Sequence, residues 1–297
     1  MTRNTYVLLG VLGVLVILAY FVMQKPGERS SSGENGEMLI SFDSLAVDRI
    51  EIISPTANVV LQKKGVEWFV ESPVSYKADQ SNVASLIHSS KTLQVSNIVS
   101  NKPDKHSVFQ VDSTGTLVKM LQNGAEKASF ILGKSGSSYS ELYARRTATN
   151  DVALVIGASP YVFSRPVKDW RDRTILSVPR EQIKEIRYQY GDTTFVLAFR
   201  DSAWTIGKDS TQEGVVTTLL SSLSNVVTDD FVDTLSTRPT KPTAQISFAG
   251  TQLTFFYVKG SEKYLVQSSA SPQWFEMQSW HANQLLMRKK DILKSHK

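Results

Sequence analysis

The chain has 297 residues, of which 41% are hydrophobic and 21% charged, so it can bury one large core or two ordinary ones and is not a disordered chain. Its 33 Lys and Arg against 28 Asp and Glu give a net charge of +5, with both signs interspersed, and we therefore expect no nucleic-acid partner. The lack of cysteine excludes disulfides, thiolate metal sites and a cysteine nucleophile.

The first predicted element is a membrane anchor over residues 6–23. This segment, YVLLGVLGVLVILAYFVM, has no charged residue, and a helix of this length just spans the hydrocarbon core of a bilayer. A cleavable signal peptide is the alternative. The apolar run is longer than the usual signal core, however, and no A-x-A-like cleavage site follows it. We therefore expect a single-pass protein that contacts the lipid bilayer through residues 6–23.

The segments on either side of the anchor predict its orientation. Residues 1–5 form a short tail, and the Lys and Arg residues near the two ends of the span hardly differ in number. Because the long C-terminal part follows so short a tail, we expect it to be translocated. The predicted location is the cytoplasmic (inner) membrane, with residues 1–5 cytoplasmic and the C-terminal domain extracytoplasmic. Residues 24–38, rich in Gly, Ser and Glu, predict a flexible tether.

The exported part contains the same pattern twice. The stretch LQKKGVEWFVE (residues 61–71) aligns without a gap with LAFRDSAWTIG (residues 197–207), which places Trp68 on Trp204. A strand with period-two alternation precedes each stretch. A run with apolar residues at helical spacing follows each, over residues 79–93 and 211–225. These repeated landmarks predict a duplication.

The rest of each half predicts a β-meander. A hairpin is expected at Asn123-Gly124 and at the matching Ala249-Gly250, because such pairs tolerate positive φ. Further strands are expected after each hairpin. The predicted fold class is α+β: an N-terminal transmembrane helix followed by two duplicated subdomains, each a mostly antiparallel sheet with a packed helix. The predicted bounds are 39–164 for the first repeat, 165–178 for a linker, and 179–297 for the second repeat with a C-terminal helix.

No motif in the sequence predicts a catalytic residue, a cofactor site or a metal site. GKS at residues 133–135 resembles the end of a phosphate-binding loop, but Ala128 replaces the earlier glycine, and we expect a loop between two strands there. The four histidines lack metal-ligand spacing, and TDDFVD (residues 228–233) lacks the glycine and carboxylate pattern of a calcium loop. We therefore expect a protein that is not an enzyme and carries no cofactor.

Two groups of aromatic residues are candidates for ligand contact. Trp68 and Trp204 lie in strands among aliphatic residues, and their repetition favours packing in the core over a stacking role. Trp274, Phe275 and Trp280 lie close together near the C-terminus. We take these three as a candidate aromatic contact surface for a glycan or a protein partner.

The order of these landmarks resembles that of a bacterial family, domain of unknown function 4340. The resemblance is carried by the anchor, the tryptophan strands, YARR…DVALV and VKDWRDRTILSV, of which D-W-R-D-R (residues 169–173) is the most specific piece. It covers residues 42–287. It implies a mostly membrane-anchored protein whose related domains occur beside gliding-type ABC transporter components, including their extracytoplasmic auxiliary subunits. It carries over no catalytic residues.

The D-W-R-D-R segment is also the candidate junction between the two repeats. Trp170 is expected to cover the junction. Arg171 and Arg173 are expected to pair with nearby carboxylates. Asp169 is the fourth residue of this candidate junction.

Together these inferences predict a membrane-anchored, extracytoplasmic, non-enzymatic accessory or scaffold protein of a cell-envelope transport complex. The expected partners are subunits of an ABC-type transporter. The alternative is an extracytoplasmic module that binds glycan or peptidoglycan, which requires the C-terminal aromatic residues to be exposed together. An envelope hydrolase is a third reading, and it requires a cleft with converging titratable residues.

Overall fold

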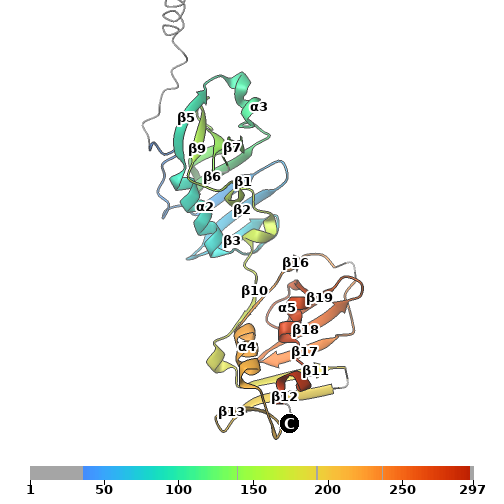
Figure 1. Cartoon of the computed structure of the whole chain (residues 1–297). Coiled ribbons are helices and arrows are strands. Elements are labelled where there is room, and N and C mark those ends of the chain that lie inside the picture. The colour runs from blue at the N-terminus through green and yellow to red at the C-terminus, as the bar shows by residue number, and fades with distance from the viewer. Residues whose placement is uncertain (1–35, 139, 192, 236, 295–297) are drawn as a thin grey trace, which may run out of the picture. The chain divides into compact units, whose positions relative to one another are not determined.

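The computed structural model describes residues 36–294 except 139, 192 and 236, and the chain divides into two compact units, Met1–Arg171 and Asp172–Lys297. Each unit contains one nine-stranded sheet, and unit 2 has a further two-stranded sheet (Figure 1). The strands of these sheets pair antiparallel to their neighbours. The fold is therefore a sheet-rich α+β fold with two large sheets. The division between the units falls inside the predicted linker.

The first strand of unit 1 lies inside its sheet and has a neighbouring strand on each side. β1 (Arg49–Ile53) pairs with β2 on one side and with β6 on the other, which gives the order β4-β3-β2-β1-β6-β7-β8-β9-β5. The remaining strands are β2 (Asn58–Lys64), β3 (Glu67–Ser72), β4 (Tyr76–Lys77), β5 (Gln94–Ser100), β6 (Thr116–Gln122), β7 (Ala125–Ser135), β8 (Leu142–Arg146) and β9 (Val152–Ile156).

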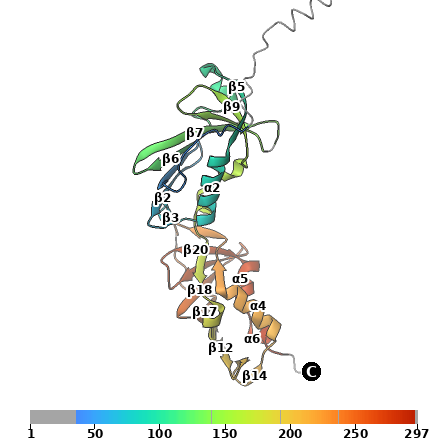
Figure 2. The ribbon, with the colours of Figure 1, turned by 90° about the vertical axis from the view of Figure 1, so that its left-hand side faces the viewer.

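The core of unit 1 lies between this sheet and one helix. α2 (Gln80–Thr92) runs alongside β2 and β3 (Figure 2) and buries Val83 and Leu86 completely. Ile50 and Ile52 alternate with less buried neighbours along β1, as the period-two pattern predicts, and face the same core. The predicted helix start is confirmed, because the side chain of Asp79 accepts a hydrogen bond from the backbone N–H of Asn82 (2.9 Å).

A second, smaller cluster covers part of the other face of the sheet. η1 (Pro103–Lys105) and α3 (His106–Phe109) lead into it, and it buries Val111, Ile131 and Val152. Residues 133–135 are not the predicted loop, because they form the end of β7. A Cβ at Gly133 would lie 2.0 Å from the backbone oxygen of Phe109, so only glycine lets α3 approach the strand this closely.

Unit 2 repeats the topology of unit 1 strand for strand. Its order is β14-β13-β12-β11-β17-β18-β19-β20-β16, which follows the order of unit 1 if β16 takes the place of β5. The strands are β10 (Thr174–Ser177), β11 (Glu185–Tyr190), β12 (Thr193–Arg200), β13 (Ala203–Ile206), β14 (Asp209–Ser210), β15 (Asn225–Val227), β16 (Asp230–Val232), β17 (Ala244–Phe248), β18 (Thr251–Val258), β19 (Lys263–Ser268) and β20 (Trp274–Gln278).

The helices of unit 2 pack on one side of its sheet (Figure 2). α4 (Glu213–Ser224) corresponds to α2 and buries Val216, Leu219, Leu220 and Leu223, the spacing of one helix face. α5 (Ser279–Leu285) packs beside it and follows β20. β10 and β15 pair separately as the two-stranded sheet.

The registers of the two sheets correspond where the sequences align. Trp68 pairs with Lys63 across β2 and β3, and Trp204 pairs with Phe199 across β12 and β13, five residues apart in both cases. The two predicted hairpins are confirmed. Asn123-Gly124 has φ of 51° and 76°, and Ala249-Gly250 has φ of 48° and 75°, as a tight turn with two positive φ angles requires.

Unit 1 is closed by a short turn at the end of its own sequence. This turn is η3 (Val167–Trp170), in which Trp170 is 1% exposed and belongs to the core. The carbonyl of Trp170 accepts a hydrogen bond from the backbone N–H of Asp79 (2.8 Å), and Arg171 forms a bridge with Ala78. The closing turn is thus fixed to the start of α2.

Unit 2 is closed in the same way. Its turn is α6 (Lys289–Ile292), and Ile292 is completely buried. The carbonyl of Ile292 accepts a hydrogen bond from the backbone N–H of Gln212 (2.9 Å), and Leu293 forms a bridge with Thr211. Residues 167–171 therefore correspond to residues 289–293, and the first part of the predicted linker is the last element of unit 1.

Among the described residues, no helix is both long and apolar enough to span a membrane. The anchor predicted over residues 6–23 and the tether up to residue 35 lie outside the described residues. The last part of the predicted tether belongs to unit 1. The backbone N–H of Val95 donates to the carbonyl of Glu37 (2.8 Å), and Met38 forms a bridge with Gln94.

Candidate functional site

The residues of the predicted junction are distributed over both units. Trp170 and Arg171 are 1% and 2% exposed, and the guanidinium of Arg171 lies 4.5 Å from the ring centre of Tyr76 in unit 1. The carboxylate of Asp169 accepts a hydrogen bond from the hydroxyl of Tyr161 (2.6 Å). Arg173 lies in unit 2. Within unit 1, these residues therefore hold the closing turn in place.

The predicted aromatic contact surface is not formed. Trp274 and Phe275 are adjacent on β20, so their side chains point to opposite faces of the sheet. They are 9% and 0% exposed, and Trp274 packs on Phe256 with 5.5 Å between ring centres. Trp280 is 65% exposed, but it lies on α5 and stacks on His281. Burial in the strand therefore removes two of the three residues from the surface.

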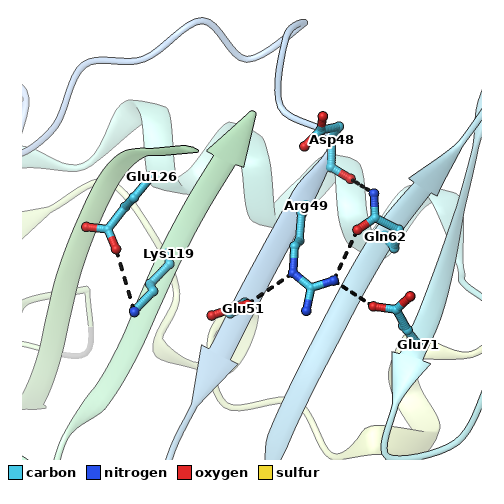
Figure 3. A network of polar contacts seen from close by, with 7 residues as sticks. All are labelled: Asp48, Arg49, Glu51, Gln62, Glu71, Lys119 and Glu126. Atoms are coloured by element: carbon cyan, nitrogen blue, oxygen red, sulfur yellow. Dashed lines mark hydrogen bonds and ion pairs between the residues drawn. The ribbon is translucent and has the colours of Figure 1, made fainter. Parts of the chain in front are cut away.

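Unit 1 presents a charged network on the sheet face that points away from α2 (Figure 3). Arg49 lies at its centre: its Nε donates to Glu51 (3.0 Å), and its Nη1 donates to Glu71 (2.6 Å) and Gln62 (3.2 Å). These hydrogen bonds, first that to Glu71 and then that to Glu51, raise the pKa of Arg49 above its ordinary value. One guanidinium thus connects three neighbouring strands.

The network continues toward the hairpin of β6 and β7. The amide of Gln62 donates to the carbonyl of Asp48 (2.9 Å), and Lys119 lies 3.6 Å from Glu126 (Figure 3). The side chains of the ion pairs are between 24% and 44% exposed. We call Arg49, Glu51, Gln62, Glu71, Lys119 and Glu126 the charged face. The charged face combines positive and negative side chains. Their mutual contacts hold them in position, and they remain accessible to a partner.

The equivalent face of unit 2 also carries ion pairs, Glu185 with Arg187 (3.8 Å) and Lys263 with Glu276, but it adds a row of neutral side chains. Gln189 pairs with Gln245, Gln245 with Thr254, and Thr254 with Gln267, so one row of neutral side chains crosses four strands. The row ends at Trp274. The two units therefore share a topology, and both open faces carry ion pairs, but only that of unit 1 is organised around one central guanidinium, and that of unit 2 carries the row of amides and a hydroxyl.

A groove of about 430 Å³ lies in unit 2, beside the tryptophan strand and the start of α4. Trp204 is half-buried there and contacts Phe199, which is 39% exposed, with 5.6 Å between ring centres. The two aligned tryptophans thus differ. The core prediction is confirmed for Trp68, which is 8% exposed, whereas Trp204 contacts the core and also lines the groove.

Sequence reasoning missed both the charged face and the groove. Asp229 and His281 are a further example, since their side chains lie 3.1 Å apart although they are distant in sequence. The alignment of the two halves did contain one signal for the groove, because Lys63 in the first half stands where the second half has Phe199. Within the described part of the chain, no group of three or more His, Asp or Glu residues is arranged to hold a metal ion.

The chain matches a protein-family model. The model is that of DUF4340, a domain of unknown function, and it matches residues 68–246, which is more than half of the chain. The match begins at the tryptophan of β3 and ends in β17, so it includes parts of both units. Searches of the curated proteins and of the solved structures gave no match.

Proposed function

This chain belongs to the DUF4340 family of domains of unknown function, and we propose that it is a membrane-anchored, extracytoplasmic, non-enzymatic accessory or scaffold protein of an ABC-type transport complex in the cell envelope. In this proposal residues 6–23 cross the cytoplasmic membrane once, and both units lie outside the cytoplasm. The transporter as partner comes from the family resemblance of the sequence.

The observation that carries the proposal is the charged face of unit 1. A small substrate is usually enclosed in a concave, largely apolar pocket, whereas protein partners meet on flatter and more polar surfaces. The ion pairs of Arg49 hold Glu51 and Glu71 in fixed positions before any partner arrives. Such an arrangement favours specific docking, because charges that are already ordered lose little entropy on binding and select a complementary pattern.

The anchor and the repeated design support the same proposal. A single helix encloses no pore, so the chain would need partners to take part in transport. Restriction to a bilayer raises its effective concentration for membrane proteins, so a modest interface is sufficient. The common strand order, the common registers and the two equivalent closing turns support an origin of the units by duplication. The two open faces differ in detail, since one carries the Arg49 network and the other carries separate ion pairs beside a row of amides, which gives a scaffold two different surfaces.

Site-specific photocrosslinking in intact membranes tests this proposal. A photoreactive residue at Glu71 or Lys119 on the charged face is expected to capture subunits of an ABC-type transporter. The matched control is Lys91, which is exposed on α2. Equal capture from Lys91, or the absence of transporter subunits from the products of Glu71 and Lys119, contradicts the proposal. Turnover of an envelope substrate by the purified chain would favour an enzyme instead.

Glycan binding is the second candidate function. Its original basis, the cluster of C-terminal aromatic residues, is not formed. The groove beside Trp204 supports it instead, because the half-buried Trp204 and the exposed Phe199 lie side by side in its wall.

A further inference from the structure

The groove of unit 2 occupies a place that is closed in unit 1. There Gln80, the first residue of α2, fixes the tryptophan strand to the helix. Its side-chain oxygen accepts from the backbone N–H of Trp68 (2.9 Å), and its amide nitrogen donates to the carbonyls of Trp68 (3.0 Å) and Ala78 (2.7 Å). One amide thus satisfies three backbone groups, and Trp68 lies buried behind it.

Unit 2 cannot form this closure. Its helix begins with Glu213, which is exposed and, as a carboxylate, accepts hydrogen bonds but donates none. The hydroxyl of Thr211 donates to the carbonyl of Trp204 in its place (2.8 Å). The helix start and the tryptophan strand are therefore not joined by a side-chain amide, and the groove lies between them.

The walls of the groove combine aromatic, apolar and hydroxyl groups. Trp204 and Phe199 form the aromatic side, and the buried residues Val216 and Leu220 of α4 supply an apolar floor. Several serine and threonine residues with hydroxyl groups also line it: Ser202, Ser210, Thr211 and Thr217. Its volume of about 430 Å³ lies within the range of small-molecule sites, roughly 300–1,000 Å³.

The charged residues give the groove a positive balance. Arg180 and Lys294 line it together with a single carboxylate, that of Glu213. The ammonium of Lys184 lies 5.1 Å from the ring centre of Phe199 and adds a third cation beside the aromatic side. The backbone of Lys294 is fixed, because its N–H donates to the carbonyl of Ser210 (3.1 Å).

We propose that this groove binds an acidic saccharide, a sugar ring that carries a carboxylate. The C–H groups on the face of a sugar ring pack against the electron-rich face of an aromatic ring. Its hydroxyls match the serine and threonine hydroxyls, and its carboxylate pairs with Arg180 and Lys294. An apolar ligand would leave these polar groups without partners. The site lies in unit 2 and is separate from the charged face of unit 1, so the proposal rests on the second candidate function, glycan binding, and not on the transport role.

Titration of the full chain in detergent micelles tests the proposal, with calorimetry and tryptophan fluorescence as readouts. The probes are tetragalacturonate as the acidic saccharide, maltotetraose as the neutral one, and a tetraglutamate peptide as an acidic non-saccharide. We expect saturable binding of tetragalacturonate alone. Arg180→Ala and Lys294→Ala should each weaken it about tenfold, as the loss of a charge-assisted hydrogen bond does. Glu213→Ala should strengthen it, because a like charge is removed.

The control variant is Lys259→Ala, which removes one positive charge from an exposed position of unit 2 that does not line the groove. It should bind tetragalacturonate like the unaltered chain. Failure of tetragalacturonate to bind, or equal weakening by Lys259→Ala and Lys294→Ala, overturns the proposal. Equal binding of maltotetraose overturns the role of the carboxylate. Binding of the peptide in place of the saccharide overturns the ligand class.

Discussion

Trp68 and Trp204 show how one residue type at equivalent positions can have two energetic roles. Trp68 is enclosed by the core of unit 1, while Trp204 contacts the core of unit 2 on one side and the groove on the other. We expect Trp68→Ala to lower the free energy of unfolding by about 3–5 kcal/mol, the cost of a large cavity. Trp204→Ala should cost less, because part of its ring is already in water. Urea unfolding measures both, and a larger loss at Trp204 contradicts this assignment.

Buried tyrosines predict a loss of stability at alkaline pH. Burial raises the pKa of Tyr188 and Tyr190 above the ordinary value of 10.0, and their hydroxyls donate to the carbonyls of Leu285 (3.1 Å) and Met287 (2.8 Å). Above about pH 10 the unfolded chain therefore releases protons that the folded chain retains, and the free energy of unfolding falls as the pH rises. Below that pH these two groups give no pH dependence.

Urea unfolding at about pH 8 and about pH 11 measures this effect. At the lower pH, Tyr188→Phe should lower the free energy of unfolding by about 1 kcal/mol, because one hydrogen bond is lost. Between the lower and the higher pH, this variant should lose less stability than the unaltered chain. The control is Tyr257→Phe, since Tyr257 is 45% exposed. An alkaline loss that is the same in all three chains is incompatible with the role of Tyr188.

At the scale of elements, the two main helices begin differently. The side chain of Asp79 caps α2 by accepting from Asn82, whereas Gln212 precedes α4 without a side-chain cap. We expect Asp79→Ala to lower the free energy of unfolding by about 1 kcal/mol, because one backbone N–H of the first turn loses its partner. Asp79→Asn should retain most of the stability, since the amide oxygen also accepts. Equal losses in the two variants would falsify the capping role.

The elements that the sequence predicts well are those with a local signal. The strands around Ile50 and Ile186 show period-two alternation, and the hairpin at Asn123-Gly124 has a turn signature, so both follow from neighbouring residues. The closing turn around Trp170 has no periodicity in its four residues. It is recognisable only from its contact with Asp79, so the sequence alone predicts a linker there.

The candidate sites were harder to predict for the same reason. Arg49 meets Glu71 only because β3 lies next to β2 in the folded sheet, which the sequence does not state residue by residue. The groove depends on the difference between Gln80 and Glu213, two residues that look alike in a sequence but differ in whether they can donate a hydrogen bond. The predicted aromatic surface was wrong for Trp274 and Phe275, because adjacent residues of a strand face opposite sides of the sheet.

At the scale of the whole molecule, the closing turns determine where the chain can be divided. Unit 1 contains its own closing turn, so we expect residues 36–171 to fold alone with a cooperative unfolding transition. Residues 36–164 lack Trp170 and leave the start of α2 without its partner, and this shorter chain should be markedly less stable or unfolded. Circular dichroism during thermal unfolding compares the two. Equal melting temperatures would show that the turn is dispensable.

The position of Trp170 also has a mechanical consequence. The chain leaves unit 1 one residue after this buried indole. The carbonyl of Trp170 also accepts a hydrogen bond from the backbone N–H of Asp79 at the start of α2. We therefore expect a pulling force that reaches unit 1 through Asp172 to be opposed by the bridge of Arg171 with Ala78 and by an aromatic ring packed in the core. This end of unit 1 is therefore secured by its core, whereas the other end is attached through Glu37 and Met38 to the edge strand β5.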